Sequence, residues 1–90
     1  MKGLFSIGQF SRITGLTVKT IRLYHEKGVL QPAWIDDETG YRYFDQADVE
    51  RARVVRRLRE LDFPLAEIRE LLAADDDSDG SGILPLLERQ

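Results

Sequence analysis

Two short stretches predict the architecture of this chain: TVKTIRLYHEKG at residues 17–28 and ETGYRYF at residues 38–44. In the first, Thr17 can cap a helix that ends at a glycine and carries Lys19 and Arg22 on its outer side. In the second, aromatic and basic residues follow a glycine turn, as in a β-hairpin. A helix with cations one turn apart fits the major groove of DNA, and a basic hairpin beside it can reach the flanking phosphates. Together the two stretches predict a DNA-binding module.

Another short helix is predicted upstream. Ser6 can cap it, and Gln9 three residues later completes a capping box. Its apolar residues recur at helical spacing: Ile7, Phe10 and Ile13. Gly15 is expected to end this helix, as Gly28 ends the next. Two short helices joined by a glycine-containing turn form a helix-turn-helix.

The stretch after Pro32 predicts a two-stranded hairpin, because proline blocks continuation of the helix and residues 36–40 contain turn residues. Branched and aromatic side chains lie on both arms: Trp34 and Ile35 on one, and Tyr41, Tyr43 and Phe44 on the other. A lone hairpin is marginal in water, so this one must pack on the helices as a wing. Trp34 is expected to anchor it.

Two more helices are predicted after the wing. Asp45 can cap the third helix, with Asp48 at its third position, and Pro64 suits the first turn of the fourth. Their apolar positions are Val54 or Val55, Leu58 and Leu61, followed by Leu65, Ile68, Leu71 and Leu72. The expected fold class is therefore mainly α with a small β-hairpin wing, a winged helix-turn-helix of four helices.

The charges are unevenly distributed along the chain. The formal net charge is -3, but residues 1–60 contain 11 Lys and Arg against 8 Asp and Glu, whereas residues 61–90 contain 2 against 8. Attraction to phosphate depends on the local field at the contacting face, so the basic part can bind DNA while the acidic end points elsewhere. The arginines between residues 51 and 59 spread around the third helix, so some are expected to pair with Glu50, Glu60 or other acids.

Composition argues against several other classes of protein. The sequence has no cysteine and one histidine, His25, which cannot form a zinc site alone and is interpreted as a surface or half-buried helix residue. No nucleophile and base pair, phosphate loop or metal cluster can be assembled, so neither an enzyme nor a cofactor is expected. No apolar run approaches the length of a membrane span, and the cytoplasm is the expected compartment.

Three regions are predicted along the chain. Residues 1–74 form the winged helix-turn-helix DNA-binding domain, and residues 75–82 form an acidic flexible linker. Residues 83–90 are apolar enough to start a dimerisation helix but too short to complete one, since isolated helices below about 12 to 15 residues are marginal. We therefore expect this last helix to be truncated.

Four blocks of this sequence resemble the DNA-binding domain of MerR-family bacterial transcription regulators, including the branch that senses drugs or other small molecules. They are IGQFS at residues 7–11, GLTVKTIR at 15–22, TGYRYF at 39–44 and LDFPLAEI at 61–68. The resemblance covers about residues 6–74. It implies a homodimer of the full-length protein that binds a pseudo-palindromic promoter operator and distorts the spacer DNA, so that RNA polymerase can engage the promoter. An effector molecule would bind outside this chain.

Carried onto this sequence, the resemblance implies a set of DNA-binding residues: Thr17, Val18, Lys19, Arg22 and Tyr24 in the second helix, and Tyr41 and Arg42 in the wing. The family pattern has paired tyrosines after the helix arginine, where this chain has Leu23 and Tyr24. A phenol contact is therefore expected to be replaced by apolar contact, for example with a thymine methyl group.

Two other functions fit the same residues. Excisionase-like architectural proteins use similar small winged helices to bend DNA, and a helix pair can also serve as a protein-interaction adaptor. These 90 residues do not predict the operator sequence, the effector, or whether the protein acts as an activator or a repressor.

Overall fold

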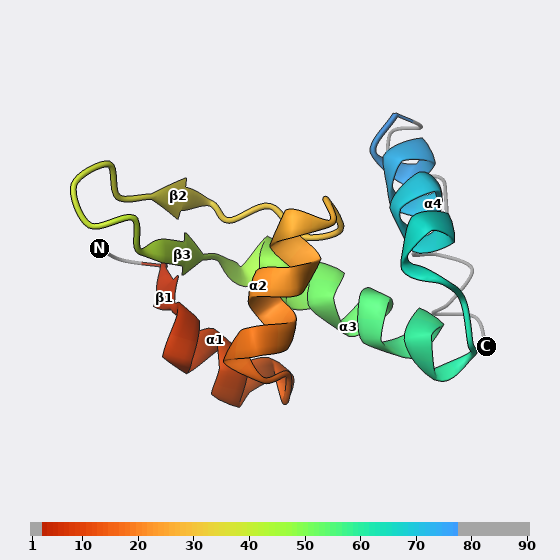
Figure 1. Ribbon diagram of the computed structural model, residues 1–90, viewed down its shortest axis with the longest axis horizontal. Coiled ribbons are helices and arrows are strands. Elements are labelled where there is room, and N and C mark those ends of the chain that lie inside the picture. The colour runs from red at the N-terminus through yellow and green to blue at the C-terminus, as the bar shows by residue number, and fades with distance from the viewer. Residues whose placement is uncertain (1–2, 78–90) are drawn as a thin grey trace.

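The computed structural model describes residues 3–77, and its elements follow the predicted order (Figure 1). They are β1 (Phe5–Ser6), α1 (Ile7–Thr14), α2 (Val18–Glu26), β2 (Trp34–Ile35), β3 (Arg42–Phe44), α3 (Gln46–Glu60) and α4 (Leu65–Asp77). The sheet lies at one end of the molecule beside α1 and α2, and α4 lies at the other, with α3 running between them. The predicted fold class, four helices with a small β wing, is confirmed.

The helices begin where short-range hydrogen bonds satisfy their free N–H groups. The Ser6 hydroxyl accepts from the backbone N–H of Gln9 at 3.2 Å, and the Ser6 N–H donates to Gln9 Oε1 at 2.9 Å. Asp45 and Asp48 form the same reciprocal box at the start of α3. Thr17 Oγ1 accepts from the N–H of Thr20 at the start of α2. All three predicted caps are confirmed, and each such cap typically stabilises by about 1 kcal/mol.

Glycines end the first two helices, as predicted. Gly15 caps α1 with φ +77°, and its N–H donates to the carbonyl of Ser11 at 2.9 Å. After Lys27, the C-cap of α2, Gly28 has φ +78° and donates to the carbonyl of His25. The N–H of Val29 then donates to the carbonyl of Tyr24, which completes a Schellman-type ending. The left-handed backbone explains why glycine occupies both positions.

The wing has one more strand than expected. β3 is central and pairs antiparallel with both neighbours, Phe5 opposite Phe44 on one side and Trp34 opposite Tyr43 on the other. A strand of two residues gives almost no periodic signal, so β1 was not predictable from the sequence. Trp34 packs against Tyr43 with ring centroids 5.2 Å apart, which agrees with its predicted anchoring role.

The core joins the wing to the helices. Phe10 of α1 stacks on Phe44 of β3 with ring centroids 4.2 Å apart, and both side chains are completely buried. The other fully buried large side chains come from α2, the loop after it, α3 and α4: Ile21, Val29, Leu30, Val49, Val55 and Ile68. Because the wing shares this core, its position relative to α2 is fixed by packing.

The apolar residues at helical spacing are not all buried: Ile13 and Leu61 are 42% and 53% exposed. Leu61 is the C-cap of α3. α4 continues through Asp77, so residues 75–77 are helical and do not belong to a linker. The remaining linker positions and residues 83–90 lie outside the described residues. Within residues 3–77 no helix is long and apolar enough to cross a bilayer.

Candidate nucleic-acid interface

The exposed face of α2 carries the predicted basic residues. Lys19 and Arg22 are both exposed and line one shallow recess together with Thr20, Leu23 and Glu26. These residues repeat at three- and four-residue steps, so they share a side of the helix while Ile21 and Tyr24 face the core. The helix therefore presents two cations and one exposed leucine on a single surface.

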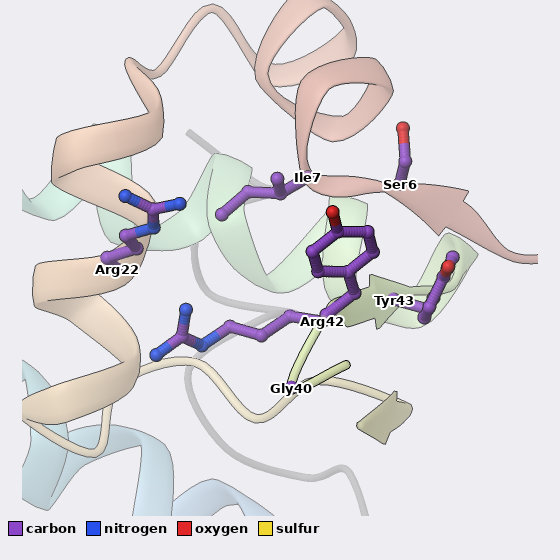
Figure 2. Close-up of a pocket in the computed structure, with 7 residues that line it drawn as sticks. Ser6, Ile7, Arg22, Gly40, Arg42 and Tyr43 are labelled. Atoms are coloured by element: carbon purple, nitrogen blue, oxygen red, sulfur yellow. The ribbon is translucent and has the colours of Figure 1, made fainter. Parts of the chain in front are cut away.

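A second recess, of about 230 Å³, lies where α2, the wing and the start of α1 meet (Figure 2). Its lining includes Arg22 from α2, Arg42 from β3, Ser6 at the end of β1 and Ile7 at the start of α1. In Figure 2, Arg42 extends from the wing toward α2, and Arg22 projects from α2 into the same space. Since Arg22 lines both recesses, Lys19, Arg22 and Arg42 lie along one continuous surface. We call this surface the basic face.

Arg42 is held in place by a residue that sequence reasoning had given no role. Its Nε donates a hydrogen bond of 2.9 Å to Nδ1 of His25, which lies in the last turn of α2. The two residues are 17 positions apart, so no local signal in the sequence could have indicated the contact. Burial lowers the pKa of His25 below its ordinary value, and the positive charge of Arg42 lowers it further, against a smaller opposing effect of Glu26.

The other predicted site residues differ in their access to solvent. Tyr41 is 66% exposed at the wing. Thr17 is exposed, but its hydroxyl already caps α2. Val18 is half-buried. Tyr24 is only 7% exposed because its ring packs in the core, so the structure does not place it on the basic face with the arginines. A DNA contact of Tyr24 stays a prediction.

The arginines of α3 support the loops and helix ends around them. Arg51 Nε donates to the carbonyl of Val29, Arg56 Nη1 to that of Thr14, and Arg59 Nη1 to that of Phe63. The predicted pairing with an acid is confirmed by an exposed ion pair of 3.7 Å between Arg56 and Glu60, of a kind that contributes at most about 0.5 kcal/mol. These arginines thus carry structural hydrogen bonds that sequence reasoning did not foresee.

Metal chemistry finds no support in the described part of the chain. Within residues 3–77 no three His, Asp or Glu side chains gather closely enough to hold an ion. What the basic face offers instead is a row of guanidinium and ammonium groups beside an apolar side chain. Such a row suits a polyanion whose phosphates are regularly spaced.

Comparison with known proteins agrees with this geometry. Residues 5–75 match the family described as MerR HTH family regulatory protein. This chain belongs to the MerR family. The match covers the wing, the first three helices and most of α4, and confirms the resemblance carried by the four sequence blocks.

One curated relative of this MerR-family chain is heavy metal-dependent transcription regulator 2 of Rhizobium meliloti. It is 41% identical over 68 residues, which make up 76% of this chain and 46% of that regulator. The chain thus spans about half the length of the curated relatives it matches. The expected small-molecule-sensing branch stays a prediction.

Solved structures of MerR-family regulators share the fold. The transcription regulator PbrR691 from Ralstonia metallidurans CH34, in complex with lead(II), superposes with a TM-score of 0.72 at 34% identity, covering 81% of this chain and 56% of that one. HiNmlR, a MerR family regulator lacking the sensor domain and bound to promoter DNA, gives a TM-score of 0.70 at 22% identity, with 96% and 69% covered. At that identity the second likeness establishes the common fold alone.

Proposed function

We propose that this chain is the sequence-specific DNA-binding domain of a MerR-type transcription regulator. In this proposal α2 enters the major groove, with Lys19, Arg22 and Leu23 toward the bases and adjacent phosphates. Tyr41 and Arg42 hold the flanking backbone from the wing. The proposed compartment is the cytoplasm, where a bacterial promoter is accessible.

One observation carries the proposal: Arg22 and Arg42, from different elements, line the same recess. Two guanidinium groups facing one space repel each other unless an anion lies between them. Neither arginine has an ion-pair partner among the described residues. A DNA phosphate beside the groove supplies the missing negative charge, and arginine is suited to bind it through two parallel N–H groups.

The larger assembly is proposed from the family resemblance. The full-length protein would bind a pseudo-palindromic operator as a homodimer and distort the promoter spacer, so that RNA polymerase can engage both promoter elements. An effector would bind outside this chain and favour one state of the distorted DNA. Specificity of this kind depends partly on the deformability of the spacer sequence.

Titration of a fluorescent duplex with this chain at several salt concentrations tests the proposal. The duplex is first selected from a random pool by the protein itself. Binding to it should weaken linearly on a log–log scale with salt, and the double variant Arg22→Ala, Arg42→Ala should lower the steepness of that dependence by roughly 2. The matched control is Arg53→Ala, which removes an exposed arginine from α3 and should bind almost as the wild type does. Affinity that does not respond to salt would argue against phosphate contact.

The same variants separate the alternative functions. An adaptor that binds protein through its helix pair would keep its partner when Arg22 and Arg42 are replaced. An excisionase-like protein would bind direct repeats cooperatively, whereas a MerR-type domain prefers the halves of an inverted repeat. The family match over residues 5–75 favours the regulator.

A further inference from the structure

His25 lies at the junction between α2 and the wing. It belongs to the helix proposed to enter the groove, and it contacts the wing arginine proposed to hold the backbone. Both side chains are half-buried, and their hydrogen bond of 2.9 Å links two elements that are otherwise separated by the loop after α2. This hydrogen bond therefore connects α2 to the wing through Arg42, a residue of the basic face.

We propose that His25 is a positioning residue for DNA binding, whose neutral imidazole holds the Arg42 guanidinium so that its two terminal nitrogens face the DNA backbone. This inference rests on the proposed function. The hydrogen bond uses Nε of Arg42, which leaves Nη1 and Nη2 without a hydrogen-bond partner among residues 3–77 and able to take a phosphate end-on. Holding a long side chain in its bound orientation reduces the conformational entropy lost on binding.

The hydrogen bond dictates the protonation of His25. Nδ1 can accept from Arg42 only when it carries no proton, so the ring must be neutral with its proton on Nε2. The charged groups acting on the ring are Arg42 across from it in β3 and Glu26 beside it in α2. Burial and Arg42 lower the pKa of His25 and Glu26 raises it, so the ring stays neutral at neutral pH. In acid, a protonated Nδ1 would face the guanidinium as a second donor and a like charge, and would release Arg42.

Nuclear magnetic resonance of the free protein tests the contact without DNA. The chain contains a single histidine, so its imidazole signals in the ¹⁵N-labelled protein belong to His25 alone. We expect the Nε2-protonated tautomer at neutral pH and a pKa below the ordinary value. Arg42→Ala should raise that pKa, and Arg53→Ala, which replaces an exposed arginine of α3, should leave it unchanged. A proton on Nδ1 at neutral pH, or the same pKa in Arg42→Ala and wild type, would overturn the proposal.

Binding measurements then test the effect on DNA. His25→Ala should weaken binding to the selected duplex about threefold to tenfold, whereas His25→Gln, whose amide oxygen can accept from Arg42, should keep most of the affinity. In an Arg42→Ala background, His25→Ala should cause no further loss of affinity for the duplex, since there is no guanidinium left to position. A purely structural histidine would show no such coupling.

The pH dependence of DNA affinity is a third test, because a purely structural role of His25 would not change it. From pH 7.5 to 5.5 the wild type should lose affinity relative to His25→Gln, which cannot titrate. His25-dependent tightening in acid would mean that a protonated ring contacts phosphate directly, and would overturn the proposal. Failure of the wild type to bind any duplex would instead defeat the proposed function, while the tautomer measurement would still decide whether His25 holds Arg42.

Discussion

The guanidinium of Arg56 in α3 donates from Nη1 to the carbonyl oxygen of Thr14, 3.0 Å away, at the last residue of α1. The two residues are 42 positions apart. Carbonyl groups at the end of a helix have no partner within the helix, and a cation near them also interacts favourably with the helix dipole. The third helix therefore stabilises the turn that joins the first two. Since α2 follows this turn and carries part of the basic face, the contact also helps to hold the basic face in place.

Gly15→Ala should destabilise the domain by about 2 to 3 kcal/mol. Gly15 has φ +77°, and a Cβ at this position would lie 2.6 Å from Nη1 of Arg56. The substitution thus adds backbone strain and displaces the arginine that caps α1. Urea unfolding followed by circular dichroism measures the change.

Gly40→Ala is the matched control for that experiment. Gly40 has a similar φ of +75°, but nothing lies within 4 Å of the position its Cβ would take. Only the strain of a left-handed alanine is expected, about 1 to 2 kcal/mol. Equal losses in the two variants would show that the Arg56 contact contributes nothing to the turn.

Asp48→Asn should remove a pH-dependent loss of stability. Burial raises the pKa of Asp48 to about 6 from an ordinary value of 3.8. Because the folded state binds this proton more tightly than the unfolded state does, the stabilisation is complete below about pH 4 and is lost as the pH rises through about 6. The loss is on the order of 3 kcal/mol for a shift of this size.

Urea midpoints of wild type and Asp48→Asn at pH 4.5 and 7.5 provide the test. Asparagine keeps an oxygen that can accept from the N–H of Asp45 but cannot ionise. Asp48 interacts with Asp45 through charge and hydrogen bonds, whereas more distant titrating groups act equally in both proteins, so the difference between their pH dependences isolates the Asp45–Asp48 pair. Parallel curves would contradict a raised pKa.

Phe44→Ala should lower the free energy of unfolding by about 3 to 5 kcal/mol, because it removes a completely buried ring that stacks on Phe10. The loss should uncouple the wing from α1 as well as lower the unfolding midpoint. Tyr41→Ala serves as the control, since Tyr41 is 66% exposed and its removal should change the free energy of unfolding by less than about 0.5 kcal/mol. Comparable destabilisation by both variants would place the wing outside the core.

Leu23→Ala should alter base preference with little effect on folding. Leu23 is 40% exposed beside Lys19 and Arg22, where its side chain can meet an apolar group on DNA. Under the proposed function, replacing one thymine of the selected duplex by uracil removes a single methyl group and should weaken wild-type binding about threefold to fourfold. In Leu23→Ala that discrimination should disappear. If uracil at every thymine position is tolerated equally by both proteins, Leu23 reads no methyl group.

The local elements of this fold were predictable in unusual detail. The capping boxes of Ser6 with Gln9 and of Asp45 with Asp48 join residues three apart, so their signals are visible in the sequence. The basic residues of α2 were predictable as exposed because the apolar positions around them have helical spacing. The reach of α4 through Asp77 was missed, since a run of aspartates ordinarily disfavours a helix.

The sequence by itself determined where α1, α2 and α3 begin, where α1 and α2 end and which side of α2 is basic, because those features depend on contacts within one or two helical turns. Only the tertiary structure decided that β1 joins the wing, that Tyr24 is withdrawn into the core, that Arg56 caps α1 and that His25 holds Arg42. Each of these depends on closing a long loop and on packing side chains from distant segments around one core. No pattern confined to a short stretch of residues contains that information.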